Sequence, residues 1–320
     1  MAYHFGSGKN SKLLYFTRNA FRMATPKSWL RSRLPAILAE LENRPDREYI
    51  ISRVNYYNRL SAGTVLPDDA VRLKDFRLKG NRSAYFFDSY EHARWFNPSL
   101  RWKYVFGDVT HVPEWPAIVK SRPVAGNNAN SVLINLDKAL HFTFLNDTTP
   151  FRSKSDRAIF RGLVDSKPHR IMFMDKYAGH PMVDAGITDR LPTLPSEWMK
   201  EKISLWKHLE YKFIMALEGL DVATNLKWVM SSNSVAVMPR PRYETWFMEG
   251  TLVPGYHYVE VMNDYSDLIE KMDYFTHHPD EAEQILHNAH EYISQFRNPQ
   301  RERLIALLTL EKYFRMTGQL

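Results

Sequence analysis

The chain lacks cysteine, and none of its hydrophobic runs is long. The absence of cysteine excludes disulfides, thiolate metal sites and cysteine nucleophiles, and it is typical of proteins in a reducing compartment. A membrane-spanning helix needs about 18 or more apolar residues. The longest uncharged stretches, residues 123–136 and 228–239, are shorter and contain Asn, Ser or Gly. A signal peptide is not recognisable either, so we expect a cytoplasmic protein, or one bound peripherally to the inner face of the inner membrane.

Several motifs of common enzyme classes are also missing. There is no G-x-G-x-x-G dinucleotide fingerprint, no G-x-S-x-G nucleophile elbow and no H-E-x-x-H zinc motif. No D-x-D occurs, and this motif is the usual divalent-metal anchor of one class of sugar-nucleotide enzymes. The sequence therefore predicts chemistry without a metal ion and without a cofactor.

The positive charge of the chain is concentrated near its N-terminus. Lys and Arg exceed Asp and Glu by 43 to 36, which gives a net charge of +7. Residues 1–39 contain no acid and seven cations, namely Lys9, Lys12, Arg18, Arg22, Lys27, Arg31 and Arg33. Aromatic and leucine residues alternate with these cations. Such a segment can lie on an anionic membrane or bind a phosphorylated partner, or it can be a helix packed on the body of the protein with its cations solvated.

The length of 320 residues predicts two domains, residues 1–155 and 156–320, with a linker near residues 148–157. In the first half, we expect helices at 27–41 and around 53–57, and strands at 84–87, 103–106 and 131–136. In the second half, we expect strands at 158–161, 170–174, 213–217, 234–238 and 256–261, and helices at 197–209, 221–230, 244–249, 265–275, 279–296 and 301–316. This alternation predicts a doubly wound parallel α/β domain whose ligands lie beyond the carboxyl ends of its strands.

Two polar clusters follow predicted strands of this domain. In the first, Arg161 and Gly162 end a strand, and Ser166 and Arg170 follow. A guanidinium beside a glycine suits bidentate contact with a diphosphate. The second cluster is a glycine turn and predicted helix start, with the residues Gly219, Asp221, Ala223, Thr224, Asn225 and Lys227. Helix amides there could bind an anion, although Asp221 also fits a simple N-cap and Gly219 a simple turn.

These residues carry a resemblance to a known family. The segments Phe160-Arg161-Gly162, Asp184-Ala185-Gly186 and the run from Tyr211-Lys212 to His257-Tyr258-Val259 resemble glycosyltransferase family 90. The family includes eukaryotic protein O-glucosyltransferases, fungal capsule xylosyltransferases and bacterial enzymes of lipopolysaccharide synthesis. Upstream, Arg53-Val54-Asn55-Tyr56-Tyr57-Asn58 resembles the bacterial branch.

The resemblance implies a GT-B architecture, in which two Rossmann-like domains face a central cleft and the C-terminal helix packs back toward the N-terminal domain. It implies that the C-terminal domain holds the nucleotide sugar, usually a UDP-sugar, through the two clusters above. It also implies inversion without a metal, with a catalytic aspartate shortly before a proline in the N-terminal domain. Asp108 occupies the matching segment and would be the general base. As an isolated residue, Asp108 also fits a turn cap.

From these observations we expect an inverting, metal-independent glycosyltransferase. It would move a sugar from a nucleotide diphosphate to a hydroxyl of a bacterial surface glycan, such as the lipopolysaccharide core, on a glycan or glycolipid acceptor. Residues 1–39 could contact an anionic membrane surface, and no nucleic acid is expected as a partner. The alternative from a different class is a noncatalytic basic protein that binds nucleic acid or an anionic polymer, which the N-terminal charge would favour.

Overall fold

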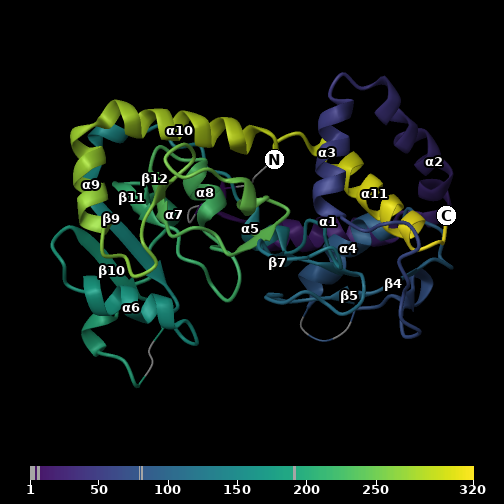
Figure 1. Cartoon of the computed structure of the whole chain (residues 1–320), viewed down its shortest axis with the longest axis horizontal. Coiled ribbons are helices and arrows are strands. Elements are labelled where there is room, and N and C mark those ends of the chain that lie inside the picture. Colours follow the sequence, from purple (N-terminus) through teal and green to yellow (C-terminus); the bar gives the residue numbers. More distant parts are fainter. Residues whose placement is uncertain (1–3, 6–7, 79, 81, 190–191) are drawn as a thin grey trace. The chain divides into compact units, whose positions relative to one another are not determined.

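The chain crosses several times between two structural units (Figure 1). The computed structural model describes residues 4–5, 8–78, 80, 82–189 and 192–320. Unit 1 consists of the described residues up to Ser11 together with Leu140–Pro241 and Gly250–Gln295. Unit 2 consists of Lys12–Ala139, Arg242–Glu249 and Phe296–Leu320. Residues 1–3 and 6–7 of the predicted basic segment lie outside the described residues.

A five-stranded parallel sheet forms the centre of unit 1 (Figure 1). The strands lie in the order β10–β9–β11–β12–β14. Their bounds are β9 (Ser155–Gly162), β10 (Val183–Ile187), β11 (Tyr211–Met215), β12 (Val235–Met238) and β14 (Val259–Glu260). Ala158 of β9 lies opposite Val183 of β10 and Phe213 of β11. The parallel α/β sheet predicted for the second half of the chain is therefore confirmed.

Both faces of this sheet are buried, which is why its strands are short apolar runs in the sequence. One face packs against Phe173, Met272 and Ile285, each from a different helix. These helices are α6 (Pro168–Tyr177), α9 (Leu268–His277) and α10 (Pro279–Ser294). Ile159 and Ile214 point to the opposite face and are at most 1% exposed. The shorter helices of unit 1 are α7 (Leu205–His208) and α8 (Leu226–Met230), and α8 packs on β12.

The chain order of the strands determines where a ligand site is expected. Numbered along the chain, the strands of this sheet run 2-1-3-4-5, which is one of the two common doubly wound orders. In this order the direction of the connections reverses between the first and third strands, and ligands bind beyond the carboxyl ends of these two strands. Here those strands are β9 and β11. The residues that follow Gly162 and Met215 therefore lie where a ligand is expected.

Unit 2 combines helices with three small sheets. Its helices are α1 (Lys12–Ala24), α2 (Lys27–Ala39), α3 (Arg47–Tyr57), α4 (Ser83–Ala93) and α11 (Pro299–Met316). Its parallel sheet contains β5 (Tyr104–Val105), β6 (Ala117–Val119) and β8 (Ser131–Leu133). Its antiparallel pairs are β3 (Val71–Arg72) with β4 (Arg101–Trp102), and β7 (Ser121–Pro123) with β13 (Tyr243–Thr245).

The remaining elements are short. In unit 1, β1 (His4–Phe5) pairs with β2 (Lys9–Asn10). Helix α5 (Lys138–His141) spans the point where the chain passes from unit 2 to unit 1. The 3-10 turns are η1 (Glu40–Asn43), η2 (Leu73–Asp75), η3 (Phe151–Ser153), η4 (Ser196–Trp198) and η5 (Glu249–Thr251).

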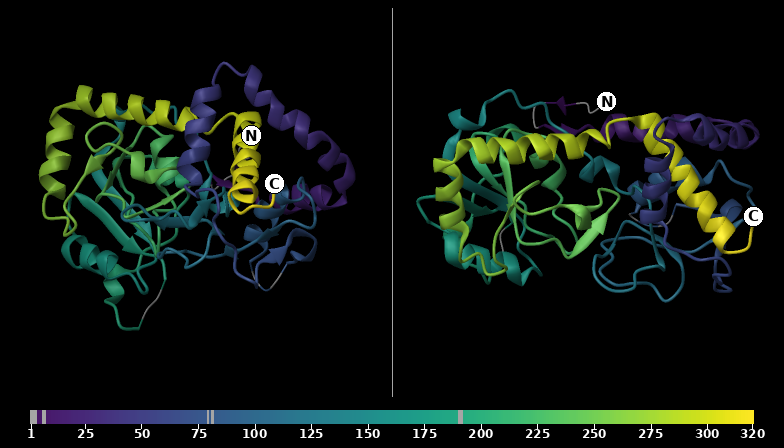
Figure 2. Two further views of the ribbon diagram at one scale, coloured as in Figure 1. Left: turned by 45° about the vertical axis from the view of Figure 1, so that its right-hand side comes forward. Right: turned by 45° about the horizontal axis from the view of Figure 1, so that its top comes forward.

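A buried arginine joins α3 to α11, which lie side by side in unit 2 (Figure 2). The side chain of Arg53 is 2% exposed, and its guanidinium pairs with Glu302 at 2.5 Å and contacts the Tyr57 hydroxyl. Burial lowers the pKa of Arg53, but the neighbouring Tyr57 and Glu302 oppose this and raise the pKa above its ordinary value. Tyr57 in turn stacks on Trp246, with ring centroids 3.9 Å apart. The segment that resembles the bacterial branch therefore connects three separate parts of the chain within unit 2.

A second buried ion pair attaches Arg242–Glu249 to unit 2. Arg122 on β7 and Glu244 on β13 are 0% and 1% exposed, and Arg122 Nε donates to Glu244 Oε1 at 2.7 Å. Tyr56 also donates its hydroxyl to Glu244. Strands β7 and β13 pair in antiparallel fashion around this contact. Eight residues of the chain thus belong to unit 2 although the residues on both sides of them belong to unit 1.

Two predicted strands are helices, so these predictions were wrong. Residues 84–87 lie in α4, whose buried Phe86, Tyr90 and Ala93 recur at helical spacing. Residues 170–174 lie in α6, which starts with Pro168, a residue suited to the first position of a helix. Both segments contain short clusters of large apolar residues, and such clusters do not by themselves distinguish a strand from a buried helix.

Other boundaries were also predicted incorrectly. Residues 244–249 do not form a helix, because their first part is the end of β13, which pairs with β7. The helix predicted at 221–230 begins only at Leu226, and the one predicted at 197–209 is reduced to η4 and α7. Residues 148–157, predicted as a linker, pack within unit 1, where Phe151 is 2% exposed and β9 begins.

Across the described chain, the structure contains no helix that is both long enough and apolar enough to cross a membrane.

The Arg53–Glu302 pair leads to a stability prediction. Glu302→Ala should lower the free energy of unfolding by about 3–5 kcal/mol, because it leaves a buried guanidinium without its carboxylate. The measurement is the midpoint of urea unfolding, which should shift without a change in the dependence of the unfolding free energy on urea concentration. Glu48→Ala is the matched control, because Glu48 is 83% exposed where it pairs with Arg47, and it should cost less than about 1 kcal/mol. Equal losses for the two variants would contradict the prediction.

Candidate functional site

The connection from β9 to α6 brings an arginine to the carboxyl edge of the sheet. After Gly162 the chain forms a loop in which Ser166 is exposed and has a φ of +55°. Pro168 then begins α6, and this places Arg170 in the first turn of the helix. Ser166 and Arg170 were both predicted from the sequence as site residues. They lie on the loop and helix that follow β9, one of the two strands between which the direction of the connections reverses; we call this place the switch point.

The guanidinium of Arg170 is held by backbone carbonyls. Its Nε donates to Glu218 O at 2.8 Å, Nη2 to Leu217 O at 2.7 Å and Nη1 to Leu163 O at 2.7 Å. An arginine has five N–H groups, so one N–H on each terminal nitrogen is not used by these three bonds. Within the described residues, Arg170 forms no ion pair with a carboxylate. Burial lowers its pKa to about 10, with weaker opposing effects from Tyr265, Asp189 and Glu218.

Two of the predicted glycines lie against this guanidinium. A Cβ atom added to Gly162 would lie 3.4 Å from Arg170 Nη1 and 3.0 Å from Phe160 Cζ. A Cβ atom added to Gly219 would lie 3.8 Å from Arg170 Nη2. Glycine at position 162 lets the backbone approach Phe160 and the guanidinium closely, and at position 219 no side chain lies between the backbone and the guanidinium. The structure therefore brings Gly162, Arg170 and Gly219 together at the ends of β9 and β11.

The guanidinium of Arg161 lies in a different cluster. It donates from Nη2 to Asp184 Oδ1 at 2.8 Å and from Nη1 to Asp184 O at 2.7 Å. Successive residues of a strand point to opposite faces of a sheet, so Arg161 lies on the face opposite Phe160. Asp184 also accepts from Lys200 at 2.5 Å and from the Tyr211 hydroxyl at 2.6 Å. A role of Arg161 in nucleotide binding stays a prediction, since its guanidinium is engaged by a carboxylate of its own unit.

Asp184 is held in its charged form by these donors. Burial raises the pKa of Asp184, but the hydrogen bonds from Lys200, Tyr211 and Arg161 outweigh it and hold the pKa well below its ordinary value. Gly186 is required beside this cluster, because a Cβ atom there would come within 2.7 Å of Lys200 Cβ. Lys200 was not identified from the sequence, and nothing in its local pattern distinguishes it from a solvated lysine.

The second predicted cluster folds as a series of turns before α8. Asp221 is 2% exposed, Ala223 3% and Lys227 0%. Thr224 and Asn225 are partly exposed, and Asn225 Nδ2 donates to Met215 O at 2.9 Å, which ties the turn to the end of β11. Helix α8 has only five residues, so its dipole is small. The predicted anion site depended on the N-terminus of a longer helix, and the described residues 221–230 do not form that helix. Partly exposed Thr224 and Asn225 remain beside the switch point.

Asp108 lies at the corresponding edge of the parallel sheet in unit 2. It follows β5, and Lys120 directly follows the neighbouring strand β6. The ammonium of Lys120 is 2% exposed and donates to Asp108 Oδ1 at 2.5 Å, while the carboxylate is 38% exposed. The next residue, Val109, donates its N–H to Ser121 Oγ at 3.1 Å. A positioned, partly exposed carboxylate of this kind can accept a proton.

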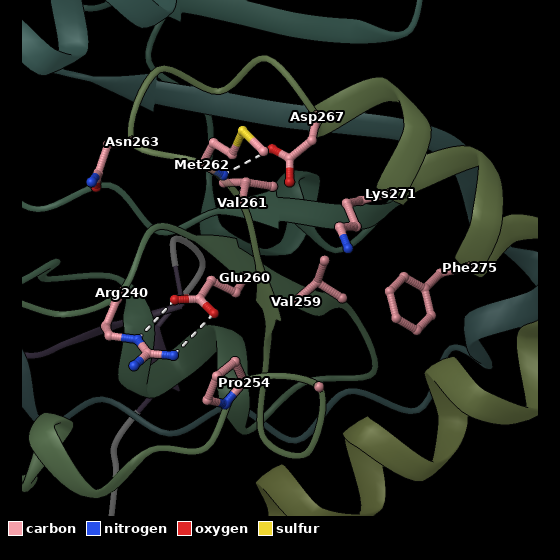
Figure 3. A pocket seen from close by; sticks show the side chains of 11 residues that line it. Arg240, Pro254, Val259, Glu260, Val261, Met262, Asn263, Asp267, Lys271 and Phe275 are labelled. Carbon is pink, nitrogen blue, oxygen red and sulfur yellow. Dashed lines mark hydrogen bonds and ion pairs between the residues drawn. The ribbon is translucent and has the colours of Figure 1, made fainter.

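A cavity of about 490 Å³ opens beside β14 in unit 1 (Figure 3). On one side, Arg240 pairs with Glu260 at 2.9 Å, and on the other side Lys271 and Phe275 extend from α9. The lining includes β14 itself and residues that follow the carboxyl ends of β12 and β14. None of the residues predicted from the sequence lines this cavity. Among the described residues, no group of three or more His, Asp or Glu side chains is arranged to hold a metal ion.

An anion site at the switch point of a doubly wound sheet is typical of enzymes that bind nucleotides. Comparison with known proteins identifies the family. The model of Glycosyl transferase family 90 matches residues 136–300. The O-glucosyltransferase LpsA of Dichelobacter nodosus is 42% identical over 306 residues, which cover 95% of this chain and 95% of that protein. The chain therefore belongs to glycosyltransferase family 90 and is a glycosyltransferase, as the resemblance implied.

The eukaryotic relatives match a smaller part of the chain. Protein O-glucosyltransferase 3 of Homo sapiens is 28% identical over 166 residues, which are 50% of this chain and 32% of that protein. Its counterpart in Rattus norvegicus is 29% identical over 138 residues, or 42% of this chain and 27% of that protein. Because the family consists of enzymes, the alternative of a noncatalytic binding protein is not supported.

The Asp184 cluster leads to a prediction about pH. The lowered pKa of Asp184 means that its ionised form stabilises unit 1 at pH values above its unfolded pKa of about 4 and that this contribution is lost as the pH falls further. Asp184→Asn should lower the unfolding free energy by roughly 1–3 kcal/mol near pH 7. The difference in unfolding free energy between Asp184→Asn and the parent should become smaller below about pH 4.

Thermal unfolding across this pH range measures the effect. Asp175→Asn is the matched control, because Asp175 is exposed on α6. The unfolding temperature of this control should equal that of the parent at every pH. A difference between Asp184→Asn and the parent that is constant down to about pH 3 would contradict the prediction.

Proposed function

We propose that the enzyme transfers glucose from UDP-glucose, with inversion and without a metal, to a hydroxyl of a bacterial surface glycan such as the lipopolysaccharide core. The observation that carries this proposal is the guanidinium of Arg170, which lies between Gly162 and Gly219 at the switch point with no carboxylate partner among the described residues. A partly buried cation with two N–H groups to spare favours a doubly charged diphosphate.

The donor would lie along the carboxyl edge of the sheet in unit 1. Arg170 would hold the diphosphate, with Ser166, Thr224 and Asn225 close to the same strand ends. The cavity beside β14 offers a place for the nucleoside, because it borders the carboxyl ends of β12 and β14. Two strand spacings separate β14 from β11, which amounts to about 10 Å. A nucleotide of this length can reach from one place to the other.

The reaction would be a single displacement, with Asp108 as general base. The acceptor oxygen attacks the anomeric carbon while the bond from that carbon to the diphosphate oxygen breaks. The hydroxyl proton passes to Asp108, and UDP leaves with the bonding electrons. Lys120 holds the carboxylate in place, and Arg170 would stabilise the charge that grows on the leaving diphosphate. Attack from the side opposite the leaving group inverts the anomeric configuration.

The choice of sugar and acceptor follows from the relatives. A protein 42% identical along almost the whole chain is an O-glucosyltransferase, which supports glucose as the sugar. The bacterial branch that the sequence resembles works in lipopolysaccharide synthesis, which supports a surface glycan or glycolipid as the acceptor. The GT-B architecture is part of the same proposal.

Arg170→Ala tests the donor site. It should weaken UDP binding roughly 10- to 100-fold, because charge-assisted hydrogen bonds to the diphosphate are lost. Binding of uridine, which has no phosphate, should be unchanged. Isothermal calorimetry with the two ligands measures both affinities, and the uridine titration also shows that the variant is folded.

Two further variants make this test specific. Arg152→Ala is the matched control, because Arg152 is an exposed arginine of unit 1 that pairs with Glu283, and it should not change UDP affinity. Arg161→Ala tests the residue predicted from the sequence. If Arg170→Ala binds UDP as tightly as the parent, the diphosphate does not lie at the switch point.

Asp108→Asn tests the general base. Turnover should fall about 100- to 10,000-fold, because the amide cannot accept the proton, while UDP affinity stays within about twofold of the parent, since Asp108 does not hold the diphosphate. Asp69→Asn is the matched control, because Asp69 is a 68% exposed aspartate of unit 2 that pairs with a lysine, as Asp108 does. If Asp108→Asn keeps more than about a tenth of parent turnover, another group is the base.

A further inference from the structure

Helix α1 packs on α4 through its polar side (Figure 1). Asn19 is 1% exposed, although it lies in the middle of the helix. The Tyr15 hydroxyl donates to Asp88 Oδ1 at 2.9 Å, and Arg22 forms an ion pair with Glu91. The most buried side of α1 is therefore made of hydrogen-bonding groups, with Phe16 beside it against the ring of Phe87 of α4 at 6.1 Å between centroids, whereas a surface helix usually buries its apolar stripe.

The partners of α1 are themselves fixed. Asp88 is 0% exposed and accepts from Lys138 N at 3.0 Å, and the Lys138 ammonium pairs with Glu91. Burial raises the pKa of Asp88 to about 6, against the charge of Lys138. Rotating α1 to bury its apolar side would take Arg22 away from Glu91 and the Tyr15 hydroxyl away from Asp88, and lost contacts to buried charges are costly. The orientation of the helix is thus set by these contacts.

The apolar side of α1 consequently faces outward. Leu13 is 77% exposed, Phe21 74% and Phe16 42%. Trp29, in the first turn of α2, is 52% exposed, with the guanidinium of Arg33 4.8 Å from its ring centroid. Isolated exposed apolar residues need no explanation, but several on one helix mark an interaction surface.

The charge around these residues indicates what they contact. Lys12 and Arg18 are exposed on α1, and no acidic residue occurs before Glu40. Aromatic side chains and cations that alternate in this way match a bilayer interface, where rings lie at the level of the headgroups and cations contact anionic lipids. An apolar contact with a second copy of the chain would bring two such cationic surfaces together, which is unfavourable.

We infer that α1 and the first turn of α2 form a surface that lies on an anionic lipid bilayer. The residues that carry it are Leu13, Phe16, Phe21 and Trp29, with Lys12 and Arg18 around them. This α1 surface would bring the enzyme to the membrane where a lipid-linked acceptor is found. It does not depend on the donor site or on Asp108, so its test needs neither donor nor acceptor.

Sedimentation with vesicles of equal parts phosphatidylglycerol and phosphatidylcholine tests the inference on the full chain. The parent should bind these vesicles and bind pure phosphatidylcholine much less. Leu13→Gln/Phe16→Gln/Phe21→Gln should weaken binding at least about 100-fold, since three large apolar side chains no longer enter the interface. Lys12→Gln/Arg18→Gln should weaken it about fivefold for each cation removed, and high salt should weaken binding of the parent.

The matched control is Val65→Gln/Leu320→Gln, which changes two apolar residues of unit 2 that are 67% and 54% exposed and should bind as the parent does. The circular dichroism spectrum and the thermal unfolding midpoint should be unchanged in every variant. The inference is overturned if the parent does not sediment with the anionic vesicles or if the triple variant binds as well as the parent. It is also overturned if the triple variant changes only the oligomeric state measured by ultracentrifugation.

Discussion

The guanidinium of Arg170 is held at a point where the backbone of a parallel sheet leaves carbonyls without strand partners. Strands β9 and β11 end side by side, and the chain then leaves each of them in a different direction. Carbonyls of Leu163, Leu217 and Glu218 converge there, and one arginine from α6 satisfies all three. The same side chain thus closes the edge of the sheet and, in the proposed function, would supply the positive charge that holds the donor.

The rest of the molecule shows how charged groups are kept in a largely apolar fold. Arg53 with Glu302 and Arg122 with Glu244 are buried pairs that connect segments far apart in the sequence. The carboxylate of Asp184 accepts hydrogen bonds from three side chains, and Asp88 accepts one from Tyr15 of α1. In each case the partner satisfies the charge, in agreement with the high cost of an isolated buried ion. Asp108, with a carboxylate that is 38% exposed, differs from these residues because solvent still reaches it.

Much of unit 1 could be predicted from sequence because its strands are buried on both faces and stand out as short apolar runs between turns. The edge on which a ligand is expected follows from the same alternation. What could not be predicted depends on contacts between distant residues. The partner of Arg161 is Asp184, 23 residues away, and sequence cannot show that Arg161 and Arg170 point to different clusters. Residues 243–245 form a strand only because β7 is available to pair with them.

Short helices were the other source of error, and the physical reason is similar. The cluster Phe86, Phe87 and Tyr90 has the composition of a strand. Burial of one of its sides within unit 2 nevertheless stabilises the helix α4. In residues 221–225, Asn225 bonds to Met215 O and the chain stays in turns until Leu226. Local preference is weak at such places, so tertiary contacts decide the conformation.

The interleaving of the two units has a consequence for biosynthesis. Helix α11 packs on α3, yet the ribosome makes α3 early and α11 only after the whole of unit 1. Until then, the Arg53 guanidinium lacks the carboxylate of Glu302. Unit 1 can complete its sheet as soon as residues 140–295 have emerged. The emerging chain can therefore finish unit 1 first, whereas unit 2 cannot be completed until residues 296–320 have been made.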